Sequence, residues 1–434
     1  MVSTLAARNG GRAGLCALVA ILLLGLGLRL DSAWQGRAPV YDAVAYARIA
    51  ANLDRDRGFT AGAAATQHSS DYSPGLPLLA AGAYKLTGGV HERLVRLLLA
   101  AIGALAVLFA YLIGRRLGGP LAGLIGAGAV AVYPALLQYQ GMLMSEPLAA
   151  TLLSGGVLAM FWADDARQGH PLVRWLLPGA VLGALAMVRP EYLGVALLLG
   201  AVVFAKGARD DWRGSLAKAA ILLAAVAVVV APWTVRNAIA LHRFVPLSTG
   251  GGQVLFAGTY LPSGGNPERV GAEVVARHPG IFAPDAVRRL RLEQILARLA
   301  AHRLPGVESD KALARMGREQ LWDDVSEEPL EYAGFLAAKV GRIWSRGPRA
   351  VMREPLWEAL HWALLALGLI GLALLAWRRR WEALVLGTVF LAITTLSALL
   401  VASPRRVLVM LPLVAALAGA GAVWLRRPDS LSDP

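Results

Sequence analysis

The 434-residue chain has a single cysteine, Cys16, and few charged residues. One cysteine excludes an intrachain disulfide framework and a multi-cysteine metal site. Charged residues make up 17% of the chain, against about 25% in a typical soluble protein, and hydrophobic residues make up 56%. This composition excludes an ordinary soluble protein and indicates an integral membrane protein.

Acidic residues are particularly scarce, because 29 Asp and Glu stand against 43 Lys and Arg and give a net charge of +14. In a soluble protein this excess would indicate a nucleic-acid partner. Here the basic residues lie at the ends of hydrophobic runs, where membrane topology and anionic lipid explain them better. We therefore expect membrane lipid, and no nucleic acid, as a partner.

Long hydrophobic runs account for most of the chain. Each is close to the roughly 20 residues that a helix needs to cross a bilayer. The first run resembles a signal peptide, but no clean cleavage site follows it, so we expect an uncleaved anchor. The sequence predicts an all-α polytopic membrane protein with about ten transmembrane helices, near residues 14–30, 95–113, 119–136, 146–162, 172–188, 191–205, 216–233, 357–377, 382–402 and 405–425.

Basic residues in the loops predict the orientation of these helices. If the N-terminus is cytoplasmic, every second connection carries positive charge, as the positive-inside rule expects. We therefore expect a cell inner (plasma) membrane protein with both termini in the cytoplasm and the candidate site on the extracytoplasmic face. The inner turns would contain Arg115 and Arg116, Arg167 and Arg174, Lys206 with Arg209 and Arg213, Arg378 to Arg380, and Arg426 with Arg427.

Polar stretches divide the chain into three predicted parts. Residues 1–233 form an N-terminal transmembrane module, and its first outward loop, residues 31–94, is the candidate catalytic loop. Residues 234–356 are the only sizeable polar region and predict a small extracytoplasmic α or α+β domain. Residues 357–434 supply the C-terminal transmembrane helices and a cytoplasmic tail.

An amphipathic stretch follows Asp42 in the first outward loop. It is too short and too polar to cross a bilayer, so we expect a helix that lies along the membrane surface, one of the amphipathic juxtamembrane helices expected in this loop. A carboxylate at the boundary between water and lipid is where a water-soluble acceptor could meet a lipid-borne donor. The predicted apolar face holds Val44, Ala45, Ile49 and Leu53, whereas Arg48, Asn52 and Arg55 fall elsewhere.

Charged side chains at the edges of membrane helices are functional candidates, because their insertion costs about 2.5–3.5 kcal/mol. Several such residues gather on the predicted outward side. Carboxylates and guanidinium groups at one membrane face suit binding of a phosphate with proton abstraction nearby. The candidates are Asp42, Asp71, Tyr72, Glu146, Arg189, Glu191, Arg236 and Arg405.

The acidic candidates also have structural explanations. Asp42 could cap the surface helix, because Asp is a favoured N-cap residue. Asp71 could be a turn residue before Ser-Pro. Glu146 directly precedes Pro147, and a helix N-terminus accommodates both an anion and a proline. His68, which lies nearby in sequence, is expected to be a surface loop residue and not a ligand.

The basic candidates have structural explanations too. Arg189 and Glu191 flank Pro190 in a break between two hydrophobic runs, where they could simply pair with each other. Arg236 follows a Pro-Trp sequence at a helix end, where it could anchor the helix at the interface beside Trp233. The residues alone leave these explanations and the functional ones open.

The order of the motifs resembles that of the family 39-type glycosyltransferases, the group with protein O-mannosyltransferases and lipid A aminoarabinose transferases, which have the GT-C fold. The match covers roughly residues 14–260 and is weaker in the C-terminal helices. Arg405 and Arg406 stand where the family often has an Arg-Tyr pair, and Ala43 follows Asp42 where it often has a second acidic residue. The matching motifs are VYDAVAYARIA, DYSPGLPLL, YPALLQYQGMLMSEPLAATLL, MVRPEYLG and APWTVRNAIALHRFVPLSTGGGQVLFAG.

This resemblance implies transfer of a sugar from a polyprenyl-phosphate donor to a protein, lipid or glycan acceptor. Asp42 would be the general base that takes the acceptor proton, with Asp71 as a second catalytic candidate, and direct displacement would invert the anomeric configuration. Arg236, with Arg189 or Arg405, would hold the phosphate. The missing second acidic residue leaves the involvement of a divalent cation open, and no other cofactor is expected. The remaining substrate-binding candidates are Tyr72, Glu146 and Glu191.

A polyprenyl-linked lipid or glycan flippase, or a transporter without catalytic chemistry, is the alternative function. A transporter more often has an internal repeat and broken helices near the middle of the bilayer. This sequence shows no internal repeat, and its charges gather at one predicted face, which favours an enzyme. A non-catalytic assembly partner in envelope polysaccharide synthesis is a third hypothesis.

Overall fold

The computed structural model describes residues 2–40, 42–62, 69–165, 172–345, 347 and 350–426. These residues form helices and connecting turns with no strand among them, so the predicted all-α architecture is confirmed and the polar region is helical where it is described. His68, Arg167 and Arg427 lie outside the described residues. The chain forms two compact units, the first made of Met1–Leu247, Arg349–Phe390 and Val407–Pro434, and the second of Ser248–Pro348 and Leu391–Arg406.

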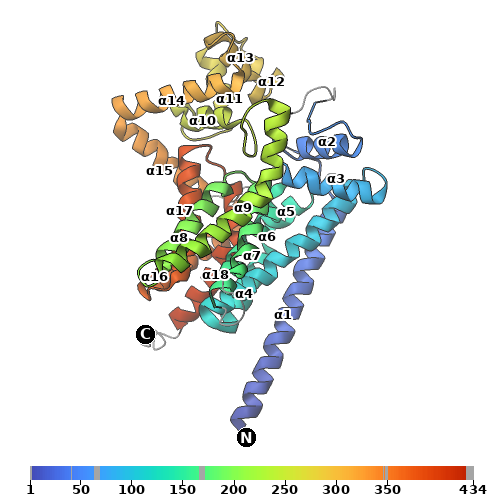
Figure 1. Ribbon diagram of the computed structural model, residues 1–434, viewed down its shortest axis with the longest axis vertical. Coiled ribbons are helices and arrows are strands. Elements are labelled where there is room, and N and C mark those ends of the chain that lie inside the picture. Colours follow the sequence, from blue (N-terminus) through green and yellow to red (C-terminus); the bar gives the residue numbers. More distant parts are fainter. Residues whose placement is uncertain are drawn as a thin grey trace. The chain divides into compact units, whose positions relative to one another are not determined.

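The first unit is a bundle of long apolar helices (Figure 1). Every predicted hydrophobic run lies largely within one or two helices, and seven of the described helices are long and apolar enough to cross a membrane. The helices of the bundle are α1 (Val2–Gln35), α4 (Glu92–Val132), α5 (Pro134–Gln140), α6 (Ser145–Asp165), η1 (Val173–Trp175), α7 (Leu176–Val188), α8 (Tyr192–Gly207), α9 (Trp212–Leu241), η3 (Ala350–Arg353), α16 (Pro355–Trp377), the first half of α17 (Trp381–Leu399) and most of α18 (Arg405–Arg426).

Helix α4 contains two of the predicted runs. Its backbone leaves helical geometry at Gly118 (φ −139°) and Gly119 (φ 87°), directly before Pro120. A positive φ suits glycine, and proline has no N–H to continue the helical bonding. The break therefore separates residues 92–117 from residues 120–132. The exact number of membrane spans stays a prediction.

The first outward loop contains two short helices, α2 (Asp42–Asp54) and α3 (Gly75–Thr87), as the sequence predicts for this loop. The predicted apolar face of α2 was wrong, because only Ile49 of its four residues is buried and the buried face also holds Ala43, Tyr46 and Ala50. Asn52, which was expected outside the apolar face, is buried beside Ile49 and donates its amide to Thr60 O at 2.8 Å. The reason is that α2 packs against α3 and the following loop, and this loop requires a hydrogen-bond donor.

Arg29 joins α1 to the end of α4. Its side chain is only 2% exposed and donates to Gly25 O at 3.0 Å, Val130 O at 2.9 Å and Ala131 O at 3.2 Å. The last carbonyls of a helix have no partner within the helix and favour a nearby cation. Arg29 therefore fixes the part of α1 from which the first outward loop departs.

Several of the predicted inner turns meet at one end of the first unit. Arg116 pairs with Asp165 at the end of α6 and, at 3.0 Å, with Glu382 at the start of α17. Lys206 at the end of α8 pairs with Asp164. Their clustering agrees with the alternation of helix directions, and the orientation of this end toward the cytoplasm stays a prediction.

The second unit is built around a close crossing of two helices. Gly252 of α10 and Gly317 of α14 lie where a Cβ would overlap the backbone of the other helix. Asp310 Oδ1 accepts from Gly252 N at 2.9 Å and Gln253 N at 3.2 Å, which satisfies the first turn of α10. The unit contains α10 (Gly251–Thr259), η2 (Leu261–Ser263), α11 (Val270–Arg277), α12 (Ala286–Arg289), α13 (Leu292–Arg303), α14 (Ser309–Glu327) and α15 (Pro329–Ser345).

Lys339 on α15 is buried in the second unit. It is 1% exposed, and its Nζ donates to Gly258 O at 2.6 Å and lies 4.9 Å from the centre of the Phe335 ring. Burial, with a contribution from the nearby Arg406, lowers the pKa of Lys339 to about 8. The charged form of this lysine is thus disfavoured in the folded protein.

Replacing Lys339 by Met should reduce the dependence of stability on pH. In the unfolded chain a lysine has a pKa of about 10.4, so the folded protein binds this proton less tightly. The stability of the wild type should therefore rise between pH 8 and about pH 10.4. The melting temperature of Lys339→Met minus that of the wild type, both measured in detergent, should be larger at pH 7 than at pH 10.5. Lys311→Met, at an exposed position, is the control, and an equal difference at both pH values would contradict the prediction.

Candidate functional site

Asp42 is the first residue of α2 and is half-buried. The next residue, Ala43, is fully buried in the hydrophobic cluster that also holds Tyr139, Met142 and Met144. The start of α2 therefore packs into the same hydrophobic cluster as the turn that leads into α6. A carboxylate in the first turn of a helix is also favourably placed with respect to the helix dipole, so the structural explanation for Asp42 and the catalytic one are compatible.

Tyr46 connects α2 to the second part of the outward loop. It lies one helical turn after Asp42, and its ring meets the ring of Tyr72 edge-on, with centroids 5.8 Å apart and planes at 77°. Tyr72 is half-buried and Asp71 is exposed. The predicted pair Asp71 and Tyr72 is thus brought to the helix that begins with Asp42.

The end of α9 holds the segment before Asp71 through the backbone carbonyl of Ser69 and the side chain of Ser70. Arg236 Nη1 donates to Ser69 O at 3.0 Å and to Asn237 Oδ1 at 3.0 Å. Ser70 Oγ lies 3.0 Å from the same Asn237 oxygen and 3.1 Å from Leu247 O. Because Asn237 is fully buried, this network fixes residues 69–72 relative to α9.

Arg236 also lies over two aromatic rings. Its guanidinium carbon is 4.8 Å from the centre of the Trp233 ring and 5.6 Å from that of Phe59. Trp233 is itself held by donation from Nε1 to Leu247 O at 2.7 Å. The predicted proximity to Trp233 is therefore present, and cation–π contacts orient the guanidinium. Arg236 has no carboxylate partner among the described residues.

Gly75 brings the same loop segment onto the end of α7. A Cβ at Gly75 would lie 2.7 Å from Val188 Cγ2 and 2.9 Å from the carbonyl carbon of Met187. Only a residue without a Cβ allows this approach without displacement of the backbone. The start of α3 therefore lies beside Arg189, which directly follows Val188.

Arg189, Glu146 and Glu191 form a largely buried ion-pair cluster. Arg189 Nη1 is 3.4 Å from Glu146 Oε1, and Arg189 Nε donates to Glu191 Oε1 at 2.9 Å. Glu146 is fully buried in the first turn of α6, while Arg189 ends α7 and Glu191 precedes α8. The expected pairing across Pro190 is thus present, and it joins three helix ends.

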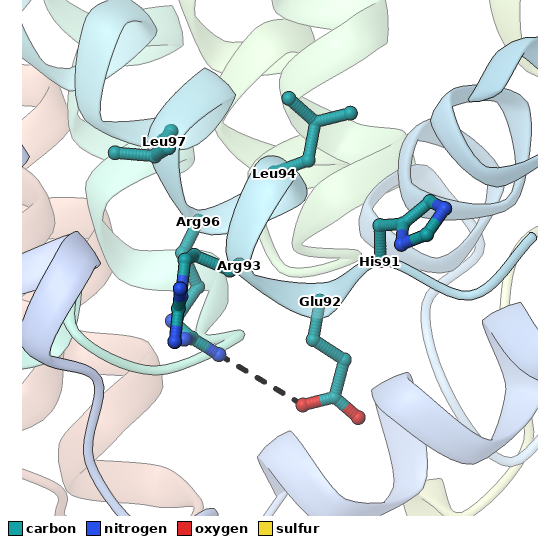
Figure 2. Close-up of a pocket in the computed structure, with 6 residues that line it drawn as sticks. All are labelled: His91, Glu92, Arg93, Leu94, Arg96 and Leu97. Carbon is teal, nitrogen blue, oxygen red and sulfur yellow. Dashed lines mark ion pairs between the residues drawn. The ribbon is translucent and has the colours of Figure 1, made fainter.

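An open hollow at the start of α4 was not predicted from the sequence (Figure 2). It has a volume of about 530 Å³ and is lined by His91, Glu92, Arg93, Leu94, Arg96 and Leu97. Its arginines already bind the end of α1, because Arg96 Nε donates to Ala33 O at 3.0 Å and Arg93 lies 4.7 Å from the centre of the Trp34 ring. The hollow therefore belongs to the junction of α1 and α4.

Other residues that hold the site together were also missed. Tyr46, Ser70 and Asn237 were not singled out, although Tyr46 and Asn237 fall within two of the motifs that carry the family resemblance. Tyr46 could have been found from its spacing of four residues from Asp42. The role of Ser70 depends on a chain separation of 167 residues from Asn237, which no local pattern reveals.

Arg405 belongs to the second unit, where it is half-buried at the first position of α18. Its neighbour Arg406 donates to Ser397 Oγ at 3.0 Å and to Val401 O within the same unit. A phosphate-binding role for Arg405 stays a prediction.

The described residues contain no group of three or more His, Cys, Asp or Glu side chains placed to hold a metal ion. Divalent cations such as Mg²⁺ and Ca²⁺ prefer several oxygen ligands, usually including carboxylates. A divalent cation can also be held by one or two carboxylates together with substrate phosphates, so its involvement at Asp42 stays a prediction.

The comparisons with known proteins agree with this architecture. Residues 71–234 match the family described as dolichyl-phosphate-mannose-protein mannosyltransferase. The archaeal oligosaccharyltransferase AglB from Archaeoglobus fulgidus, in complex with an inhibitory peptide and a dolichol-phosphate, is similar with a TM-score of 0.56 and 17% identity over 97% of this chain and 52% of its own. The complex of the A. fulgidus oligosaccharyltransferase with Zn and sulfate has a TM-score of 0.55 and 17% identity over 96% of this chain and 49% of its own.

Two further comparisons complete these findings. ArnT from Cupriavidus metallidurans in the apo state has a TM-score of 0.43 and 15% identity over 95% of this chain and 78% of its own, and this lower similarity adds nothing to the assignment. No match to the chain was found among curated protein sequences.

The predicted GT-C glycosyltransferase fold is confirmed, and the chain is a multi-pass membrane protein. It spans about half the length of the oligosaccharyltransferase that it resembles. The matched family is described as a mannosyltransferase, and the similar structures are those of an oligosaccharyltransferase. Both are glycosyltransferases, the enzyme class that the sequence predicts.

Replacing Gly75 by Ala should destabilise the protein, because the new Cβ would overlap the backbone of α7. Overpacking of this kind typically costs about 1–3 kcal/mol. Gly82→Ala in the same helix is the matched control, since nothing lies within 4 Å of its Cβ position, and it should be neutral or stabilise by up to about 1 kcal/mol. Thermal melting in detergent measures both, and equal melting temperatures for the two variants would show that the close approach is absent.

Replacing Arg189 by Met should destabilise the protein by about 3–5 kcal/mol, because Glu146 would keep a buried charge without its cation. Adding Glu146→Gln removes that charge, so the double variant should be more stable than Arg189→Met alone. Chemical or thermal denaturation of the two variants tests this. If the double variant is as unstable as the single one, the pair is not coupled.

Proposed function

We propose that this protein transfers a sugar from a polyprenyl-phosphate donor to an acceptor on the extracytoplasmic face of the membrane. The observation that supports it best is the position of residues 69–75. This segment contacts α2 through Tyr72, α7 through Gly75 and α9 through Ser69. Candidate acids and bases from distant parts of the sequence are thereby joined within one compact unit.

Asp42 would act as the general base in this reaction. The acceptor hydroxyl oxygen attacks the anomeric carbon, its proton passes to the Asp42 carboxylate, and the bond from carbon to the phosphate oxygen breaks. The phosphate leaves with the electron pair. Attack from the side opposite the leaving group inverts the configuration at the anomeric carbon. The half-buried start of α2 suits this role, because a base must reach both water-soluble and membrane-bound reactants.

Arg236 is the better of the two phosphate-binding candidates in the first unit. The charge of Arg189 is offset by Glu146 and Glu191. Arg236 contacts a carbonyl, an amide oxygen and two rings, all of which are neutral. Its positive charge therefore remains available to stabilise the charge that develops on the leaving phosphate.

The comparisons support the proposed donor and acceptor classes. The similar oligosaccharyltransferase was solved with a dolichol-phosphate and an inhibitory peptide, which supports a polyprenyl-phosphate donor and a peptide or glycan acceptor here. We retain the predicted arrangement in which the protein lies in the cell inner membrane with cytoplasmic termini. In that arrangement residues 234–356 form an extracytoplasmic domain and residues 357–434 the C-terminal membrane helices.

Replacing Asp42 by Asn should lower the rate of sugar transfer by about 10²–10⁴-fold, the usual contribution of a general base. Purified protein in detergent with a radiolabelled polyprenyl-phosphate sugar provides the assay. Asp54→Asn, at the other end of α2, is the matched control and should retain wild-type transfer. Wild-type activity in Asp42→Asn would rule out Asp42 as the base, and transport of the lipid without any transfer would favour the flippase alternative.

A further inference from the structure

A cavity of about 510 Å³ lies within the second unit. Its volume falls in the range of roughly 300–1,000 Å³ that is usual for small-molecule sites. It is formed where the end of α10 and η2 face the ends of α11 and α13 and the second half of α14. None of the site candidates described above takes part in it.

The apolar wall of the cavity is a pair of stacked aromatic rings. Phe256 and Tyr260 lie 5.4 Å apart at 28°, and both are almost fully buried. Tyr260 lines the cavity, and its buried hydroxyl has no hydrogen-bond partner among the described residues. Burial raises the pKa of this phenol, so it remains a neutral donor. A buried hydroxyl without a partner is costly, which indicates that something outside this part of the chain satisfies it.

The polar walls carry opposite charges. Arg277 and Arg303 contribute guanidinium groups from the ends of α11 and α13, while α14 contributes Asp324 and Gln320. Asp324 Oδ2 and Gln320 Nε2 are also buried and have no hydrogen-bond partner among the described residues. Burial, with the neighbouring Asp323, Glu328 and Glu327, raises the pKa of Asp324. The carboxylate is therefore more stable when a ligand donates a hydrogen bond to it.

We propose that this cavity binds a neutral saccharide residue. A sugar offers an apolar ring face to the aromatic wall and several hydroxyls that both donate and accept hydrogen bonds. Such hydroxyls match the phenol, the amide, the carboxylate and the guanidinium groups, which include both donors and acceptors. A phosphate-bearing ligand fits less well, because Asp324 and its acidic neighbours would repel it.

A peptide is a weaker candidate for this cavity. An extended peptide is usually held by the edge of a sheet, and a helical peptide by an apolar groove. The second unit has no strand among its described residues, and its cavity has a charged rim. The identity of the bound saccharide as part of a glycan acceptor rests on the proposed function. The binding itself does not depend on that function.

Binding of methyl α-mannopyranoside, methyl N-acetyl-β-glucosaminide and methyl β-arabinopyranoside to the full chain in detergent tests the proposal, with saturation-transfer NMR as readout. At least one glycoside should bind. Tyr260→Phe, which keeps the ring, should weaken binding about 5-fold, and Asp324→Asn about 10-fold or more. Tyr260→Phe should also leave the melting temperature unchanged or raise it, because it removes a buried hydroxyl without a partner. A residue that only supports the fold would not show weaker binding together with unchanged stability.

Trp322→Ala is the control, because this exposed aromatic residue lies on α14 outside the cavity and could bind sugars nonspecifically. It should leave binding unchanged. Failure of all three glycosides to bind, or binding that neither Tyr260→Phe nor Asp324→Asn weakens, would overturn the proposal. Binding of a basic peptide that depends on Tyr260 and Asp324, without glycoside binding, would replace it with a peptide site. Glycoside binding in a protein that never transfers sugar would uphold the cavity and refute the transferase.

Discussion

The candidate active site depends on the immobilisation of residues 69–75. This segment has no regular structure before α3 begins, so its position is set by contacts with other elements. Arg236 binds the backbone carbonyl of Ser69 and the buried Asn237 side chain accepts from the Ser70 hydroxyl on one side, and the missing side chain of Gly75 allows contact with α7 on another. A loop held by backbone hydrogen bonds and close packing can position Asp71 and Tyr72 although both lie outside a helix.

The two phosphate-binding candidates of the first unit, Arg189 and Arg236, differ in their electrostatic surroundings. Arg189 lies between two carboxylates, so that cluster carries no excess positive charge and mainly ties the ends of α6 and α7 to the start of α8. Arg236 is oriented by rings and neutral oxygens, which leave its charge uncompensated. An arginine therefore joins neighbouring helix ends in one place and is suited to anion binding in another.

Much of the fold could be predicted because lipid imposes a simple rule. Every backbone group in the membrane must bond within its own helix, so each span must be a long apolar run, and all the predicted runs are helical. The rule fails at the surface. The buried face of α2 was misplaced because Asn52 looks polar in sequence but satisfies a loop carbonyl, and a hydrogen-bond requirement of that kind is invisible to a hydrophobic pattern.

The candidate site could be predicted only in part for a related reason. Asp42, Glu146, Arg189 and Arg236 stand out because charges at helix ends are expensive and therefore rare. The residues that position them carry no such signal. Ser70 is a common small polar residue, and Gly75 is one of 47 glycines. Their importance comes from partners more than 100 residues away, Asn237 and Val188, so it follows from the tertiary structure and from no local pattern.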